Sequence, residues 1–520
     1  MASNSQEIIQ DVRAQFEHLM DFVSGEKAQI ATADQIEQGL FKLLVILGAR
    51  LLQLFFVLRS KNCSREALLT QKGKVLRYHR ETVRHYYSIF GKITFERPYF
   101  YTATLGRALP LDEALSIGPN GYSDLLRELS GYVDVDSVYH KTAEIFKRLL
   151  GLSLSTRDLQ ANMAEDAFDV EAYYAQKLPP QPVPAATILV AQADGKGIPM
   201  ILEEDEDKPE PVRLGKGQKR GNKKEAIVTS AYTIAPARRT PQEIVDSYFD
   251  LSQAEFAKET QLPDGHLRPK PQNKHIWATL DGKDIALSRL AKQINLHEGP
   301  HIQERVALCD GCEALQLRLA LYLKGFVIVL DFIHASEYLW KVANVLLGET
   351  NPNRIKWMAE KTFLMLSGKT DTLIADFLNQ AQLTEISAAQ QTQLKITANY
   401  FERNLPYMDY PTCLSKGWPI ASGVIEGACR HFVKDRCELS GMRWTQSGAE
   451  NLLRLRAIAE NGDWDAYHTY RKAQRHLRLY GKPWSAPKMI ASQKNGLPTT
   501  ALEVAAICEP QVYAGLPLAV

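Results

Sequence analysis

Residues 187–202 read TILVAQADGKGIPMIL and decide the fold class. The run at 187–191 is β-branched or aliphatic and leads into Asp194, a pattern typical of a buried strand that ends in an acid. Gly195 and Gly197 then predict a turn, because glycine readily adopts the backbone conformations of turns. We expect the chain to return along a second strand at 198–202.

Further strands follow in the same style. Residues 226–234 predict the third strand of a meander. Residues 306–309 and 326–330 predict two more strands, with a helix at 313–324 between them. A meander followed by strands that alternate with a helix predicts a mixed α/β sheet.

Helical sequence lies on both sides of this sheet. Residues 334–405 and 422–460 are helical in pattern, and four prolines at 179–184 predict a linker before the sheet. Residues 5–58 also predict helices. Strand-forming residues at 80–103, around Gly91-Lys92, predict a β-hairpin.

Residues 122–175 predict another group of helices. One helix ends at Gly151 and the next opens at Ser155, with Asp158 three residues later as a capping box. A helix, a short glycine-containing turn and a second helix form the pattern of a helix-turn-helix. An ordinary packed pair of helices has the same pattern, so both interpretations stay open.

The composition excludes several classes of protein. The 520 residues are 45% hydrophobic, and 62 Lys and Arg against 60 Asp and Glu give a net charge of +2. Such a chain is neither collagen-like nor wholly disordered, and any basic binding surface must be local. Seven cysteines suggest no disulfide framework, which predicts a reducing compartment. The first residues lack the pattern of a signal peptide.

The apolar run at 40–58 resembles a membrane segment. Lys42, Arg50 and Gln53 interrupt it, whereas a spanning helix needs about 20 residues with few or no charges. We therefore expect no membrane span, and a buried or self-associating amphipathic helix instead.

Three acids are candidates for a common site. Asp194 and Asp310 each end an apolar strand before a glycine, and Glu426 follows a helix start at Ser422-Gly423. Taken singly, each is most often a turn residue or an acid near a helix N-terminus. Together they could supply oxygen ligands to two Mg²⁺ or Mn²⁺ ions. Two such ions would clamp the attacking and leaving oxygens of an in-line phosphoryl displacement.

Basic residues accompany these acids. Arg430 and Lys434 follow Glu426 at spacings of four and eight, so we expect all three on one helical face. Residues 427–482 carry 11 Lys and Arg against 6 Asp and Glu, and 213–224 carry six basic residues and no acid. Both segments could neutralise phosphates, although charged faces and loops are most often only solvated.

Three other patterns have competing interpretations. Asp331 and His334 could orient each other or contact a phosphate, or they could be a capping Asp and a structural His. Trp444 is most often a packing residue at such a position, but beside a nucleic-acid-cleaving site it could stack on an unpaired base. Cys309 and Cys312 form a CxxC pair, but no second pair lies at metal-ligand spacing, so we expect no zinc site.

Five longer strings carry a family resemblance. They read AQADGKGIPM, KKEAIVTSAYTI, VALCDGCEALQ, VIVLDFIHASEYLWKVA and ASGVIEGACRHFVKDRCELSGMRW. In these strings, and in their order, the chain resembles bacterial DDE insertion-sequence transposases of the Kra-type group, relatives of the Mutator-like superfamily. The similarity runs over residues 80–460 and includes GKITFERPYFY and LPLDEAL.

The resemblance implies a ribonuclease-H-like core with an α-helical insertion. In that core Asp194, Asp310 and Glu426 are the catalytic and metal-binding residues, and Asp331 and His334 are accessory residues. Related members often have paired cysteines near RPYFY. This chain has none there, so we do not expect a zinc-stabilised element.

The chain is expected to divide into six regions. They are a helical region at 1–78 that could self-associate, a DNA-binding region at 79–180 with the hairpin and the helix-turn-helix pattern, the core at 185–340, the helical insertion at 341–420, the last core helix at 421–460 and a basic tail at 461–520.

The implied function is a transposase that binds the terminal repeats of its own insertion sequence and then cleaves and transfers DNA strands, with two Mg²⁺ or Mn²⁺ ions. Its partners would be double-stranded DNA, at the element ends and at the target, and further copies of itself, as a dimer or larger. Its expected location is the bacterial cytoplasm, at the nucleoid. The residues expected to contact DNA are Lys216, Lys219, Arg220, Lys223, Lys224, Arg430, Lys434, Arg436, Arg443 and Trp444.

Two alternatives stay open. The first is a structure-specific DNA endonuclease without strand transfer. The second is a DNA-binding protein derived from a transposase, without catalysis.

Overall fold

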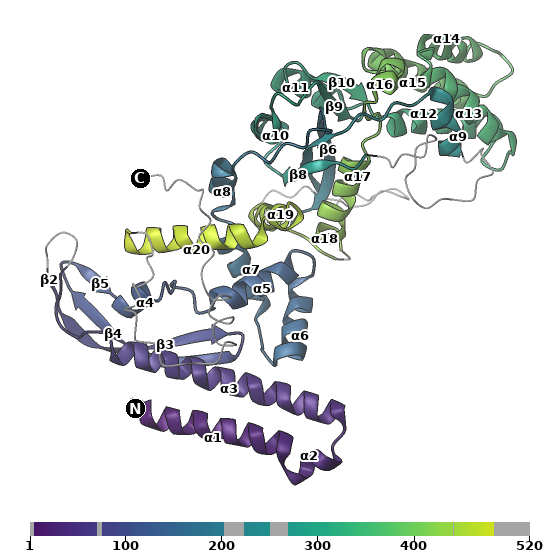
Figure 1. Cartoon of the computed structure of the whole chain (residues 1–520). Helices are drawn as coiled ribbons and strands as arrows, with labels where there is room; N and C mark the ends of the chain where they lie inside the picture. The colour runs from purple at the N-terminus through teal and green to yellow at the C-terminus, as the bar shows by residue number, and fades with distance from the viewer. Residues whose placement is uncertain (1–4, 70–74, 202–222, 250–268, 440, 483–520) are drawn as a thin grey trace, which may run out of the picture.

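A computed structural model gives the fold of this chain (Figure 1). It describes residues 5–69, 75–201, 223–249, 269–439 and 441–482. Of the residues expected to contact DNA, Lys216, Lys219 and Arg220 lie outside these ranges.

The central sheet has five strands. They are β6 (Ile188–Pro199), β7 (Lys223–Ile234), β8 (Gln272–Thr279), β9 (Glu304–Cys309) and β10 (Val327–Leu330), in the spatial order β10-β9-β6-β7-β8. Strands β6, β7 and β8 form an antiparallel meander, whereas β9 and β10 run parallel to β6. The predicted mixed α/β sheet is therefore confirmed.

One predicted turn is wrong. Gly195 and Gly197 lie inside β6, which pairs with β7 without interruption from Ile188 to Pro199. A Cβ on Gly197 would lie 3.1 Å from the Lys223 side chain, and one on Gly195 would collide with Glu225. The glycines therefore make room for side chains of β7 rather than turning the chain. The third strand of the meander is β8, which the sequence analysis missed.

Helices cover both faces of the sheet. Alternate residues of β6 point to opposite sides, as they do in any strand. Leu189 and Ala191 pack against α10 (Lys283–His297) and α11 (Glu313–Tyr322). Ile188 and Val190 face the other side, where they join the core formed by α12 (Phe332–Leu347) and the helices that follow it.

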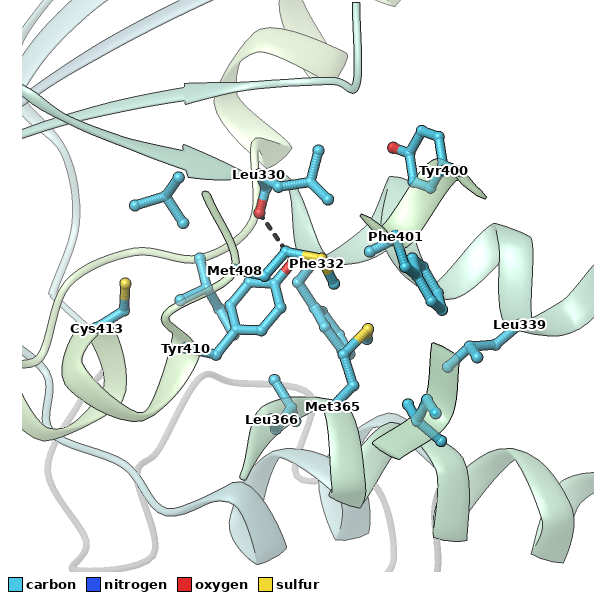
Figure 2. Packing of buried hydrophobic residues seen from close by; sticks show 14 of the residues in the cluster. Leu330, Phe332, Leu339, Met365, Leu366, Tyr400, Phe401, Met408, Tyr410 and Cys413 are labelled. Atoms are coloured by element: carbon cyan, nitrogen blue, oxygen red, sulfur yellow. Dashed lines mark hydrogen bonds between the residues drawn. The ribbon is translucent and has the colours of Figure 1, made fainter. Parts of the chain in front are cut away.

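The predicted helical stretch at 334–405 is confirmed. After α12 come α13 (Asn353–Leu366), α14 (Thr370–Gln380), α15 (Ala388–Asn404), the 3-10 turn η1 (Leu405–Tyr407) and α16 (Tyr410–Lys416), with α9 (Pro241–Phe249) packed against α13. Figure 2 shows how this group joins the sheet. The buried Tyr410 hydroxyl donates to the carbonyl of Leu330, at the end of β10, across 3.1 Å.

The chain then returns to the sheet through a set of shorter helices. These are α17 (Gly423–Gly427), the π-helix η2 (Ala428–Lys434), α18 (Asp435–Cys437) and α19 (Gln446–Glu460), which packs on β8.

The segment expected as a basic tail is helical at its start. Helix α20 (Trp464–Tyr480) crosses back over the helices that precede the sheet (Figure 1). Its Arg471 is 2% exposed and pairs with Asp166 at 2.5 Å, and Arg475 pairs with Asp124. These arginines therefore hold the fold together instead of forming a free basic surface. Residues 483–520 lie outside the described part of the chain.

The N-terminal region is a helical hairpin on a small sheet. It contains α1 (Ser5–Ser24), α2 (Glu26–Ile30), α3 (Ala33–Lys61), the short strands β1 (Leu68–Leu69) and β2 (Val75–Leu76), the sheet strands β3 (Tyr78–Ser88), β4 (Gly91–Thr102) and β5 (Gly106–Ala108), and α4 (Pro110–Ala114). Ser88 pairs with Gly91, so the predicted hairpin is confirmed. Helix α3 is the one described helix long and apolar enough to cross a membrane, by length and composition only.

Four helices connect this region to the central sheet. They are α5 (Asp124–Asp134), α6 (Tyr139–Leu150), α7 (Thr156–Asp166) and α8 (Val170–Gln176). Helix α6 ends at Gly151 with a φ of +70°, as predicted. Ser155 caps α7 by accepting from the Asp158 N–H, but the Asp158 carboxylate accepts from Tyr122 instead of completing the capping box.

Candidate active site

Three acids lie in one row across three neighbouring parallel strands. Ala193 of β6 lies beside Cys309 of β9, and Cys309 lies beside Leu330 of β10. The next residue in each case is an acid: Asp310 and Asp331 follow the ends of β9 and β10, whereas Asp194 lies within β6, which continues along β7 to Pro199. The carboxyl ends of parallel strands are a common place for ligand sites in α/β proteins.

Asp194 is oriented by two hydrogen bonds. Its Oδ1 accepts from the backbone N–H of Gly195 at 2.6 Å, and its Oδ2 accepts from the thiol of Cys429 at 3.2 Å. Cys429 comes from the π-helix η2, so this contact joins that helix to the middle of β6. Burial, followed by the negative charge of Asp194, raises the pKa of the Cys429 thiol.

Asp310 lies in a turn that the helical insertion holds. Its Oδ1 accepts from the backbone N–H of Cys312 at 3.0 Å. From α15, Arg403 donates to the Gly311 carbonyl at 2.7 Å, and the Tyr400 ring packs so closely that Gly311 has no room for a side chain. Burial raises the pKa of Asp310, and the negative charge of Asp194 raises it further.

Asp331 joins two helix starts. It is fully buried, and its Oδ1 accepts from the backbone N–H groups of Ile333 at 2.6 Å and His334 at 3.2 Å, which caps α12. Its Oδ2 accepts from the backbone N–H of Ser422 at 2.6 Å, at the start of α17. These contacts match the structural interpretation of Asp331 as a capping residue.

Glu426 faces His334 across the site. Its Oε1 lies 3.8 Å from Nε2 of His334. Burial raises the pKa of Glu426, the charge of Asp331 raises it further, and His334 opposes both effects. The structure therefore brings Glu426, Asp331 and Asp194 into one electrostatic neighbourhood with Asp310.

The expected common face of Glu426, Arg430 and Lys434 is interrupted. Residues Ala428–Lys434 form a π-helix, in which hydrogen bonds span five residues instead of four. A spacing of four or eight therefore no longer keeps side chains in line. Arg430 and Lys434 are nevertheless exposed.

Two of the expected DNA-contacting residues are buried. Arg436 is 1% exposed, donates to the Asp134 carbonyl at 3.0 Å, and lies over the rings of Tyr139 and Trp444. Trp444 is 5% exposed, and its Nε1–H donates to the Cys437 carbonyl at 3.1 Å. Both residues pack inside the fold, so neither can contact a strand of DNA.

The other expected contacts differ in their surroundings. Lys223 pairs with Glu438, and Lys224 donates to Gln446 at 2.7 Å. Arg443 is exposed. These three residues place basic groups on the surface near the start of β7.

The chemistry of the acids fits a divalent cation, although their present positions do not form a ligand cage. No group of three or more His, Cys, Asp or Glu side chains in the described ranges stands close enough to hold a metal ion. The acids are hard oxygen donors, and burial, followed by their like charges, raises the pKa values of Asp310 and Glu426. A cation would relieve this repulsion.

Neither a scan against protein-family models nor a search of curated proteins found a match to this chain.

Sequence reasoning missed several residues of this site. Cys429, Tyr400 and Arg403 carry no motif and reach the acids only through folding. Glu426 and Cys429 are three residues apart, and in a helix this spacing places both side chains on one side. This spacing is the sequence feature that could have predicted Cys429 near the site.

Proposed function

We propose that the chain is a metal-dependent DNA transposase that cleaves the ends of its own element and joins them to target DNA. The observation that carries the proposal is the row formed by Asp194 within β6 and by Asp310 and Asp331 at the ends of β9 and β10, with Glu426 opposite. A meander followed by two parallel strands and a helical insertion is compatible with the ribonuclease-H-like core that the resemblance implies.

Asp194, Asp310 and Glu426 would hold two Mg²⁺ or Mn²⁺ ions. When bound, such ions supply charge stabilisation for an in-line displacement at phosphorus. The chain itself would orient these acids. Gly195 and Cys429 fix Asp194, the Gly311 turn fixes Asp310, and His334 faces Glu426.

DNA would approach over exposed basic groups. Arg430 and Lys434 follow Glu426 in the chain and are exposed, and Lys224 and Arg443 lie on the described surface near the start of β7. Their positive charges would neutralise phosphates and release counterions. The helices α5–α7 are the proposed reader of the terminal repeats, and two copies of the chain would process the two ends together, in the bacterial cytoplasm.

One observation favours an alternative. The described acids do not form a ready metal cage. The same arrangement is expected of a DNA-binding protein that is derived from a transposase and does not catalyse DNA cleavage. Incubation of the protein with DNA that carries the sequences flanking its gene separates the two. Breaks that require Mg²⁺ support the enzyme, and binding without breaks under several divalent metals supports the alternative. A joined donor–target product distinguishes the transposase from a simple endonuclease.

A further inference from the structure

Helix α3 exposes a stripe of large apolar side chains. These side chains are 40–49% exposed. They recur every three or four residues, except at position 48, where the helix has a glycine. The stripe consists of Phe41, Leu44, Leu51, Phe55 and Leu58. Residues spaced three and four apart lie on one side of a helix, which is the pattern of a helix-packing seam.

The gap in the stripe is Gly48, and an aromatic ring fills it. A Cβ on Gly48 would lie 2.6 Å from Cε1 of Phe90, which belongs to the turn between β3 and β4. The Phe90 ring therefore takes the place of the missing side chain between Leu44 and Leu51. The apolar surface is continuous along the helix.

The other sides of α3 already have partners. On one side Arg50 pairs with Asp11 of α1 at 3.0 Å. On another side the Phe56 ring stacks on Phe95 of β4, with the ring centres 4.3 Å apart. The stripe is thus the side of α3 that stays nearly half exposed, apart from Gly48, on which the Phe90 ring packs.

Four of the five stripe residues are arranged in pairs about Gly48, whereas Leu58 has Gln38 at the matching position. Counted from Gly48, Phe41 and Phe55 stand seven residues away on either side, and Leu44 and Leu51 stand four and three away. Glu37 and Arg59 lie eleven residues away in opposite directions, so acid and base are matched. In an antiparallel pair of these helices, Phe41 of one copy would therefore contact Phe55 of the other, and leucines would contact leucines. Glu37 of one copy would lie beside Arg59 of the other.

We propose that a second copy of this chain covers the stripe, with the two α3 helices antiparallel about a two-fold axis near Gly48. A two-fold interface uses the same patch on both copies, which is what this internal symmetry provides. The inference does not depend on the proposed DNA chemistry.

The stripe on α3 alone is smaller than a stable dimer interface, so the proposed dimer also uses α1. Residues 37–59 span about 33 Å at ~1.5 Å per residue, and a strip about 10 Å wide covers roughly 330 Å². A stable interface buries about 800 Å² on each partner. Helix α1 lies along α3 and also exposes large apolar side chains, namely Phe16, Met20 and Val23, which are 38–50% exposed.

A lipid bilayer is a poorer occupant than a second copy. Helix α1 packs along α3 and carries several charged residues that a hydrocarbon layer would exclude. These residues are Glu7, Asp11, Arg13, Glu17 and Asp21.

The test is the mass of the full-length chain in solution, measured by light scattering after size exclusion over a range of concentrations. The wild type is expected at twice 58.5 kDa. Leu51→Glu should shift the mass to that of one chain, with an unchanged circular-dichroism spectrum, since Leu51 is 48% exposed. Lys42→Glu changes the charge of the same helix off the stripe and should leave the dimer intact.

Charge reversal tests the antiparallel arrangement itself. Glu37→Arg and Arg59→Glu should each weaken the dimer about tenfold or more, and the double variant should restore it. A wild-type monomer at all concentrations would overturn the proposal. So would a double variant that is weaker than either single one, or a wild-type monomer that pellets with phosphatidylcholine vesicles through this stripe.

Discussion

The carboxylate of Asp331 accepts a hydrogen bond from the backbone N–H of Ser422 at 2.6 Å, across 91 residues of sequence. The same side chain caps α12 through Ile333 and His334. One buried acid therefore ties the first helix after β10 to the helix that carries Glu426. The position of Glu426 depends on this contact, because Ser422 stands four residues before it.

Substitution of Asp331 should lower stability more than loss of an ordinary cap. Asp331→Ala removes a helix cap and leaves the buried Ser422 N–H without its acceptor, which should cost about 2–4 kcal/mol of unfolding free energy. Asp409 caps α16 from an exposed position, so Asp409→Ala should cost only about 1 kcal/mol. Urea denaturation of both variants measures the difference. Equal losses would contradict the structural role assigned to Asp331.

The exposed cations that follow Glu426 along the chain should contribute to DNA affinity. Arg430→Ala and Lys434→Ala should each weaken binding and should each lower the slope of log affinity against log salt concentration by about one. Lys395 is exposed on α15 and serves as a control of the same charge. Fluorescence anisotropy at several salt concentrations gives the slopes. An unchanged slope in both variants would remove these residues from the DNA path.

Trp444 should act in stability and not in base stacking. Trp444→Ala should cost about 3–5 kcal/mol, because it empties a buried site between Arg436 and the end of β6. Trp444→Phe keeps a ring and loses the hydrogen bond to Cys437, so its cost should be smaller. Guanidinium denaturation compares the two. A folded, fully stable Trp444→Ala protein that fails only in strand transfer would restore the stacking hypothesis.

The stability of the fold should fall as pH is lowered below 6.5, in part because of His468. Burial, with the nearby charge of Arg471, lowers the pKa of His468 to about 2, and neither ring nitrogen has a hydrogen-bond partner within the described residues. The unfolded chain takes up this proton near pH 6.5 and the folded chain does not.

Each pH unit below 6.5 should therefore cost about 1.4 kcal/mol through this residue. His468→Phe should flatten that dependence between pH 6.5 and 5, measured by urea denaturation at fixed ionic strength. A variant with the same acid sensitivity as the wild type would show that His468 is not responsible.

Pattern alone predicts much of this fold, and its failures have physical causes. The apolar strands around Asp194 and Asp310 and the helices of the insertion follow from periodicity. The turn at Gly195 was wrong because a glycine also serves where a neighbouring side chain approaches a strand. Strand β8 was missed because its first half, Gln272 to His275, is polar.

The site was only partly predictable for a similar reason. The sequence places Asp194 and Asp310 after apolar strand residues, but it does not show which strands are neighbours or that β6 continues past Asp194 to Pro199. It also does not show that Arg436 turns inward to lie over Tyr139, because charge by itself gives no direction. The link between Cys429 and Asp194 joins residues 235 positions apart and exists only in the folded chain.

The most direct test of the central claim is a cleavage assay on DNA that carries the sequences flanking the gene. The wild-type protein and Asp194→Asn are compared on a sequencing gel, with Mg²⁺ and then with EDTA, and urea denaturation checks that the variant is folded. We predict breaks at a defined end that require Mg²⁺ and are absent with Asp194→Asn. Full cleavage by the folded variant, or binding without breaks under every divalent metal, would contradict the account.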